Sequence, residues 1–274
     1  MRTGLWSAPQ ETAAPAAGLL YQQAAMTPLP AWIRLLAAAA LALASCSGDA
    51  RPTVRVFAAA SLTAPFGQLV EEFASQHPEL RVELHCAGTP QLVMQLREGA
   101  PADVFASADL EQMERVVAYG QAAGAPRVFA RNTLSIVTPI DDDANVAALA
   151  DLGREGVTSL LCAPDVPAGR YAREALHRAG VSCTPASDEP SVRAVVSKVS
   201  LGVADAGVVY RTDAAAASGR VREVSIPALH NVTASYPIVP IATGAAPEHG
   251  HAFVAFVLGD AGRRVLTQHG FAAP

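Results

Sequence analysis

Two short segments place a hydroxyl residue where a strand is expected to end and a helix to begin. In residues 57–63 (FAAASLT), Ser61 can offer its hydroxyl together with the free backbone N–H groups of a helix start. These groups lie at the positive end of the helix dipole, an arrangement that binds anions. In residues 86–90 (CAGTP), Thr89 precedes a proline that suits the first helical turn. Each hydroxyl residue is therefore either a helix cap or a ligand donor.

The second half of the chain repeats this arrangement. Residues 166–171 (VPAGRY) and residues 189–193 (EPSVR) each lead into an expected helix and offer backbone N–H groups. A dianion removed from water needs several donors, and each charge-assisted hydrogen bond contributes about 1.5–3 kcal/mol. Four helix N-termini facing one cleft therefore predict an oxyanion site, although capping explains any one of them alone.

The sequence lacks the motifs of the common enzyme classes. It contains no GxSxG, GxxxxGK[ST], GxGxxG, HExxH or CxxC segment. His249 and His251 form a close pair in residues 246–252 (APEHGHA), which indicate a solvated loop rather than a metal site because no third ligand is apparent. A catalytic Ser61 would require a base and an orienting carboxylate, and no histidine lies within the cleft turns in the sequence. We therefore expect no catalytic residues, no cofactor and no directly coordinated metal cation.

Composition is that of an ordinary α/β protein. The chain has 274 residues, of which 51% are apolar and 16% charged, enough for two lobes with two cores. The formal charge is −5 and the basic residues form no large cluster, which disfavours nucleic-acid binding.

Strands and helices are expected to alternate along the chain, which predicts largely parallel sheets with helices on their faces. The expected strands are 53–57, 81–85, 103–106, 127–130, 133–138, 159–162, 203–210, 221–224 and 235–243. The expected helices are 62–76, 91–97, 110–119, 168–179, 191–201, 252–258 and 261–269.

The C-terminal segments need a partner sheet, so we expect two discontinuous Rossmann-like lobes of the α/β class with a ligand cleft between them. The first lobe would comprise residues 53–133 plus 230–274, and the second residues 134–229. The acidic residues 141–143 (DDD) predict a loop followed by a helix N-terminus.

Residues 1–45 are expected to be an N-terminal extension and export signal, with translation starting at Met1 or Met26. The apolar run 35–44 is about half the roughly 20 residues that a membrane-spanning helix needs. It ends in LASC, which resembles the bacterial lipobox, so Cys46 would be lipidated and residues 46–52 would form a tether. The alternative is an ordinary cleavage site at which Cys46 is incidental.

Three further cysteines leave two alternatives open. A disulfide between Cys162 and Cys183 is conceivable in an oxidising compartment. The alternative is that Cys86, Cys162 and Cys183 are all buried thiols.

Several segments resemble the periplasmic molybdate-binding proteins of ABC importers. They are 56–63 (VFAAASLT), 87–109 (AGTPQLVMQLREGAPADVFASAD), 166–176 (VPAGRYAREAL), 189–196 (EPSVRAVV) and 202–214 (GVADAGVVYRTDA). The resemblance extends over residues 53–274 and implies a periplasmic-binding-protein fold of type II that closes on molybdate or tungstate. It further implies a monomer that delivers the anion to a membrane permease with a cytoplasmic ATPase.

Carried over residue by residue, the resemblance implies five oxyanion contacts. Ser61 and Thr89 would each donate from hydroxyl and backbone N–H, Ala168 and Val192 from backbone N–H, and Tyr210 from its phenol hydroxyl. All of these donors are neutral, so hydrogen bonds and helix dipoles would hold the dianion.

This chain departs from the family pattern at three neighbouring positions. Thr89 replaces a serine of many members, and Gly88 and Pro90 stand where others carry serine. The donor set would reject phosphate, whose proton needs an acceptor. Sulfate has the same charge and no proton, so another tetrahedral oxyanion such as sulfate remains the alternative ligand.

Four charged residues near these turns also have structural interpretations. Asp103 and Asp109 are expected to bind backbone amides or to cap the next helix. Arg170 and Arg193 follow the expected N–H donors and are interpreted as exposed surface residues, with anion steering or contact to the other lobe as alternatives.

Overall fold

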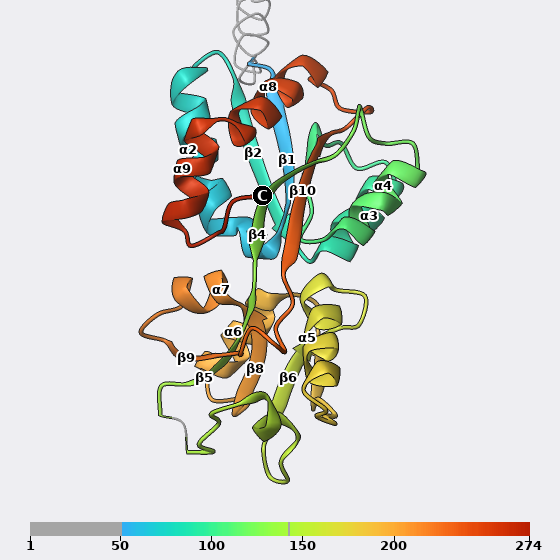
Figure 1. The fold of residues 1–274 in the computed structure, drawn as a ribbon. Helices are drawn as coiled ribbons and strands as arrows, with labels where there is room; N and C mark the ends of the chain where they lie inside the picture. The colour runs from blue at the N-terminus through green and yellow to red at the C-terminus, as the bar shows by residue number, and fades with distance from the viewer. Residues whose placement is uncertain (1–50, 142) are drawn as a thin grey trace, which may run out of the picture. The chain divides into compact units, whose positions relative to one another are not determined.

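The computed structural model describes residues 51–141 and 143–274, and its strands form two five-stranded sheets (Figure 1). The first sheet has the order β2-β1-β3-β10-β4. Its strands are β1 (Thr53–Ala59), β2 (Arg81–Ala87), β3 (Val104–Ala106), β4 (Arg127–Asn132) and β10 (Ala234–Pro240). Strand β1 pairs in parallel with β2 and β3, whereas β10 runs antiparallel to β3 and β4.

The second sheet has the order β7-β6-β8-β5-β9. Its strands are β5 (Leu134–Pro139), β6 (Ser159–Cys162), β7 (Ser187–Glu189), β8 (Ala206–Tyr210) and β9 (Val221–Ser225). Strand β6 pairs in parallel with β7 and β8, and β5 runs antiparallel to β8 and β9.

The chain passes between the two sheets twice. Strand β4 continues into β5 through Thr133, and residues 226–233 lead from β9 back to β10. We call the first sheet with its helices the first lobe, and the second sheet with its helices the second lobe.

Helices cover the sheets of both lobes (Figure 1). In the first lobe α2, α8 and α9 lie on one side of the sheet and α3 and α4 on the other, and in the second lobe α5 lies on the side opposite to α6 and α7. The helices are η1 (Ala60–Leu62), α2 (Thr63–Gln76), α3 (Thr89–Arg97), α4 (Leu110–Ala118), η2 (Leu149–Gly153), α5 (Pro167–Arg178), α6 (Val192–Ser200), α7 (Arg211–Ala216), α8 (Pro247–Leu258) and α9 (Asp260–Gln268).

The core of the first lobe is built on aromatic side chains. Phe66 and Phe73 on α2 pack against Phe253 on α8, with ring centroids 6.2 and 5.2 Å apart. These residues are fully buried or nearly so, and each such side chain contributes about 1.5–3 kcal/mol of hydrophobic stabilisation. This packing holds helix α8 against helix α2, which follows β1 in the chain.

The expectation of a solvated loop around the histidine pair was wrong. His249 and His251 lie in α8, which begins at Pro247. Proline suits a first helical turn, and Gly250 lies so close to the backbone oxygen of Asp103 that a Cβ would come within 2.7 Å of it. The missing side chain of Gly250 therefore lets α8 pack closely against Asp103 in a segment whose composition favours a loop.

The loop predicted at residues 141–143 is confirmed, since residues 141 and 143–148 form a loop and the short 3-10 helix η2 follows it. Two short elements were not predicted: β7 and α7, which have three and six residues. Such short elements carry too few periods to stand out in a sequence.

The prediction for the two aspartates is confirmed. Asp103 accepts hydrogen bonds from the backbone N–H groups of Arg55 and Ala246, both at 2.7 Å. Asp109 caps α4 by accepting the N–H of Gln112 at 2.9 Å.

Cys86, Cys162 and Cys183 are free thiols, so the alternative of a disulfide between Cys162 and Cys183 is wrong. The alternative of three buried thiols holds only in part, because only Cys162 is fully buried.

None of the helices in the described part of the chain is long and apolar enough to cross a membrane. Residues 1–50, with the expected export signal and Cys46, lie outside the described residues.

Candidate functional site

All five residues expected to contact an oxyanion line one small cavity between the lobes. Its walls are Ala59, Ala60, Ser61, Gly88, Thr89, Ala108, Val166, Pro167, Ala168, Ser191, Val192 and Tyr210. The cavity has a volume of about 10 Å³, which is room for about one water molecule and too little for a sugar, an amino acid or a peptide.

Strand ends and helix starts position these residues. Ser61 lies in η1 directly after β1, Thr89 opens α3 after β2, and Tyr210 is the last residue of β8. Ala168 and Val192 lie in the first turns of α5 and α6. The backbone N–H groups of a first helical turn have no acceptor within their own helix, so they can serve a ligand.

The capping alternative for the two hydroxyl residues does not hold. The N-cap positions of α2 and α3 are Leu62 and Gly88, and neither helix has a side-chain cap. The hydroxyl of Ser61 instead lies 3.1 Å from the hydroxyl of Tyr236. Thr89 is only 2% exposed and lines the small cavity.

Tyr210 contributes a buried hydroxyl without a partner. The residue is 1% exposed, and its hydroxyl makes no hydrogen bond within the described part of the chain. Burial raises the pKa of Tyr210 well above its ordinary value of 10, so the hydroxyl keeps its proton and can donate. A buried polar group without a partner costs about 1–3 kcal/mol, which a ligand acceptor would offset.

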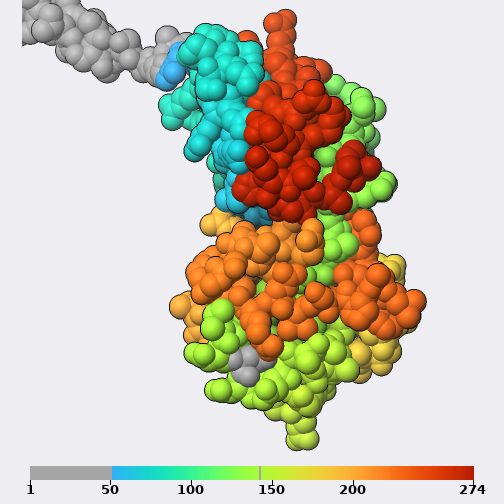
Figure 2. Space-filling view, turned by 60° about the vertical axis from the view of Figure 1, so that its left-hand side comes forward, coloured from blue at the N-terminus to red at the C-terminus, as the bar shows by residue number. Residues whose placement is uncertain are grey.

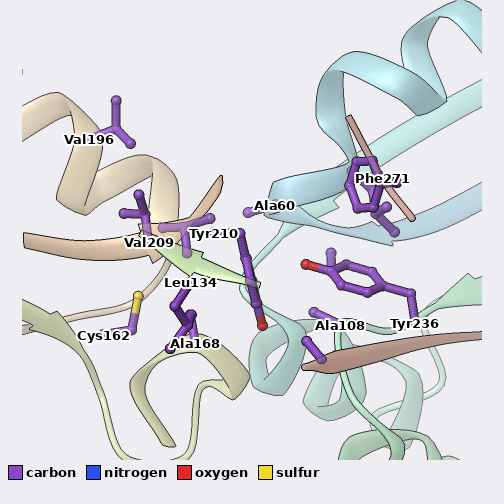
Figure 3. Close-up of a cluster of buried hydrophobic side chains, with 14 of the residues drawn as sticks. Ala60, Ala108, Leu134, Cys162, Ala168, Val196, Val209, Tyr210, Tyr236 and Phe271 are labelled. Atoms are coloured by element: carbon purple, nitrogen blue, oxygen red, sulfur yellow. The ribbon is translucent and has the colours of Figure 1, made fainter. Parts of the chain in front are cut away.

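Tyr236 is a neighbour that the sequence analysis missed. Its ring centroid lies 5.6 Å from that of Tyr210, and both rings lie among the small side chains of Ala60 and Ala108 (Figure 3). Its hydroxyl also accepts a long hydrogen bond of 3.5 Å from the amide of Asn132. Tyr236 lies 175 residues from Ser61 in the sequence, so no local pattern could have identified it.

The walls of the small cavity carry no charged side chain. A ligand there would meet hydroxyl groups, backbone N–H groups and alanine or valine surfaces. Such walls favour an anion that hydrogen bonds and helix dipoles can neutralise, and they provide no carboxylate for a cation.

A larger cavity of about 580 Å³ lies beside the small one and shares Ala60 and Ser61 with it. Residues from the start of α2, from α6 and α7, and from the C-terminal segment 268–271 line it. Figure 2 views this face, where the C-terminal segment (red) lies above the segment of α7 (orange).

Asp213 lines the larger cavity and is linked to Tyr210. Its carboxylate accepts the backbone N–H of Tyr210 at 3.3 Å. Burial raises the pKa of Asp213 to about 7, against the lowering effects of this hydrogen bond and of the nearby Arg193.

The two arginines have different surroundings. Arg170 forms ion pairs with Asp109 and Glu111 of the first lobe, so the alternative of contact to the other lobe holds, although the side chain is also partly exposed. Arg193 is exposed, as expected, and lines both the larger cavity and a second groove that includes Gly88.

Metal ligands do not gather anywhere in residues 51–141 and 143–274. No group of three or more histidine, cysteine, aspartate or glutamate side chains there could hold a metal ion. His249 and His251 therefore have no third ligand among the described residues.

Two α/β lobes with a small neutral cavity between their strand ends have the architecture of a ligand-binding protein of the solute-binding class. Residues 54–272 match the family model described as bacterial extracellular solute-binding protein, and the chain belongs to this family. The molybdate-binding protein ModA of Mycobacterium tuberculosis (strain ATCC 25618 / H37Rv) is 41% identical over 233 residues, which cover 83% of this chain and 89% of that protein.

Solved structures share the fold. The periplasmic molybdate-binding protein of Azotobacter vinelandii matches with a TM-score of 0.70 and 20% identity over 81% of this chain and 99% of that chain. The sulfate-binding protein SubI from Mycobacterium tuberculosis H37Rv matches with a TM-score of 0.70 and 17% identity over 81% and 87%. The predicted two-lobed α/β fold is confirmed.

Proposed function

We propose that this protein captures molybdate and tungstate outside the cytoplasm and delivers the anion to the permease of an ABC transporter. The observation that carries the proposal is the buried, protonated and unpartnered hydroxyl of Tyr210 on a small cavity without charged walls. The 41% identical relative named as a molybdate-binding protein supports the choice of anion.

In this proposal Ser61, Thr89, Ala168, Val192 and Tyr210 hold the anion. Ala168, Val192 and Tyr210 line the cavity from the second lobe, and Ser61 and Thr89 line it from the first. In this proposal both lobes therefore donate to the same anion. Each bond to a charged oxyanion contributes about 1.5–3 kcal/mol, so several together suffice for tight binding.

A binding site whose polar groups are all hydrogen-bond donors selects tetrahedral anions that carry no proton. Phosphate carries a proton at neutral pH, and this proton would meet donors rather than an acceptor, at a cost of about 1–3 kcal/mol. Sulfate carries no proton, so size alone would exclude it. Its shorter bonds would leave donors on one side of the cavity out of reach.

We further propose that the protein works as a lipid-anchored monomer at the outer face of the cell membrane. The segment LASC before the tether 46–52 supports lipidation at Cys46, and the extracellular description of the family supports export. The partners would be a permease and its cytoplasmic ATPase, with no nucleic acid.

We propose no catalytic activity and no cofactor. A nucleophilic Ser61 would need a base, but His269 and Asp213, which line the larger cavity with Ser61, are hydrogen-bonded to Gln68 and to the backbone N–H of Tyr210 instead. The hydrogen-bond partner of Ser61 is the hydroxyl of Tyr236, whose pKa burial raises well above 10.

Isothermal titration of the purified protein with molybdate, tungstate, sulfate and phosphate tests the proposal. We expect 1:1 binding of molybdate and tungstate below micromolar concentration, and no heat from phosphate or sulfate. Equal binding of sulfate would contradict the selectivity and favour the sulfate alternative. No binding of any of the four anions would contradict the proposed function.

A further inference from the structure

Three charged side chains join the lobes beside the small cavity, and we call Asp109, Glu111 and Arg170 the latch. Arg170 belongs to α5 of the second lobe, whereas Asp109 and Glu111 lie at the start of α4 in the first lobe. The guanidinium pairs with both carboxylates, and its Nε lies 3.1 Å from Glu111. The Asp109 side chain is 0% exposed and that of Arg170 is 36% exposed, so one end of the latch is excluded from water.

Asp109 uses its two carboxylate oxygens for different purposes. One oxygen accepts the N–H of Gln112 and caps α4, a contact within the first lobe. The other oxygen accepts from Arg170, a contact that requires the lobes to be close together. At the same helix turn the side-chain amide of Gln112 donates to the carbonyl oxygen of Asp165 at 3.0 Å, a second crossing contact.

The latch is rigidly connected to the small cavity. Arg170 follows Ala168 by two residues within the first turns of α5. A force that holds Arg170 against α4 therefore also holds the N–H of Ala168 at the cavity. If the lobes separate, the carboxylate of Asp109 loses its cation, and the charged groups return to water.

We propose that the latch is a closure device, in which Arg170 and Asp109 position the first turn of α5 over the bound anion and slow its release. This inference rests on the proposed function. An anion can enter only while the lobes are apart, before the latch forms. The latch therefore acts on the dissociation rate, because a bound anion can leave only after the latch has opened.

The test compares Asp109→Asn, Arg170→Gln and the double variant with the matched control Asp188→Asn. Asparagine at position 109 keeps an oxygen for the cap and replaces the oxygen that accepts from Arg170 by an uncharged NH2 group. Asp188 pairs with Arg173 at 2.5 Å, and both lie in the second lobe. The control thus removes an arginine–aspartate pair that does not cross between the lobes.

The readout is the release of radiolabelled molybdate from preloaded protein after a chase with unlabelled molybdate. We expect about 5- to 30-fold faster release in each single variant, since a partly exposed charge pair is weaker than a fully buried one. The double variant should release no faster than the faster single variant, because the two residues act through one contact. Asp188→Asn should match the wild type.

A second readout does not depend on the anion. Hydrogen exchange at the first turn of α4, measured without added molybdate, should be faster in Arg170→Gln than in Asp188→Asn because α4 loses its partner in the other lobe. The latch would be overturned by equal hydrogen exchange in Arg170→Gln and Asp188→Asn. It would also be overturned by wild-type release rates in the single latch variants, or by additive effects in the double variant. Failure of the wild type to retain molybdate would contradict the proposed function, and the exchange comparison would still decide the latch.

Discussion

Replacing Tyr210 by phenylalanine separates ligand binding from folding. The substitution removes one hydroxyl and keeps the ring that packs against Tyr236 at 5.6 Å. The hydroxyl has no partner in the described part of the chain, so its loss breaks no hydrogen bond of the anion-free protein. The lost bond to a dianion contributes about 1.5–3 kcal/mol, so the dissociation constant for molybdate should rise about 10- to 150-fold.

The anion-free stability should behave differently. We expect the free energy of unfolding of Tyr210→Phe in urea to stay within about 0.5 kcal/mol of the wild type or to increase, since a buried polar group is removed. Tyr236→Phe is the control, because it breaks bonds to Ser61 and Asn132 and should lower stability by about 1 kcal/mol. Unchanged molybdate affinity in Tyr210→Phe, measured by titration calorimetry, would refute the assignment of this hydroxyl as a donor.

Three further substitutions test the cleft. Gly88→Ala should weaken molybdate binding at least tenfold in calorimetry, because a Cβ at Gly88 would overlap the carbonyl oxygen of Pro190 in the other lobe; unchanged affinity would mean that the lobes need not approach this closely. Thr89→Val should weaken molybdate binding about 10-fold or more, because it removes the hydroxyl that would donate to the anion. The control is Thr63→Val, which should leave the affinity unchanged because the hydroxyl of Thr63 already donates to the carbonyl oxygen of Ala60. Equal effects of the two substitutions would contradict a direct contact of Thr89 with the anion. Asp213 has a folded-state pKa raised from 3.8 to about 7, so the wild type should lose stability relative to Asp213→Asn as pH rises from about 4 to about 7 and then level off; a difference in unfolding free energy that does not change with pH would contradict this.

Much of the fold was predictable because its signals are local. Alternating apolar residues predicted the strand that became β1, and the helical spacing from Leu62 to Phe73 predicted α2. Both patterns arise from the side-chain periods of strand and helix. The histidine pair was misplaced because residues 246–252 have the composition of a loop, whereas the structure begins α8 at Pro247.

The candidate site was likewise only partly predictable from the sequence. The turns that carry Ser61, Thr89, Ala168 and Val192 were visible in the sequence as strand ends followed by helix starts. Tyr210 was named there only through the family resemblance. The structure adds that its hydroxyl is buried without a partner and that Tyr236 lies beside it.

The sequence by itself indicated most of the strands and helices and the export signal that we still propose, and the family resemblance added the set of neutral donors. Only the tertiary structure decided that Arg170 meets Asp109, that Ser61 meets Tyr236, and that a side chain at Gly88 would strike the opposite lobe. Sequence periodicity reports the sterics of a few neighbouring residues, whereas these contacts join positions up to 175 residues apart. They exist only after two lobes have each buried a core and closed on each other, which no local pattern encodes.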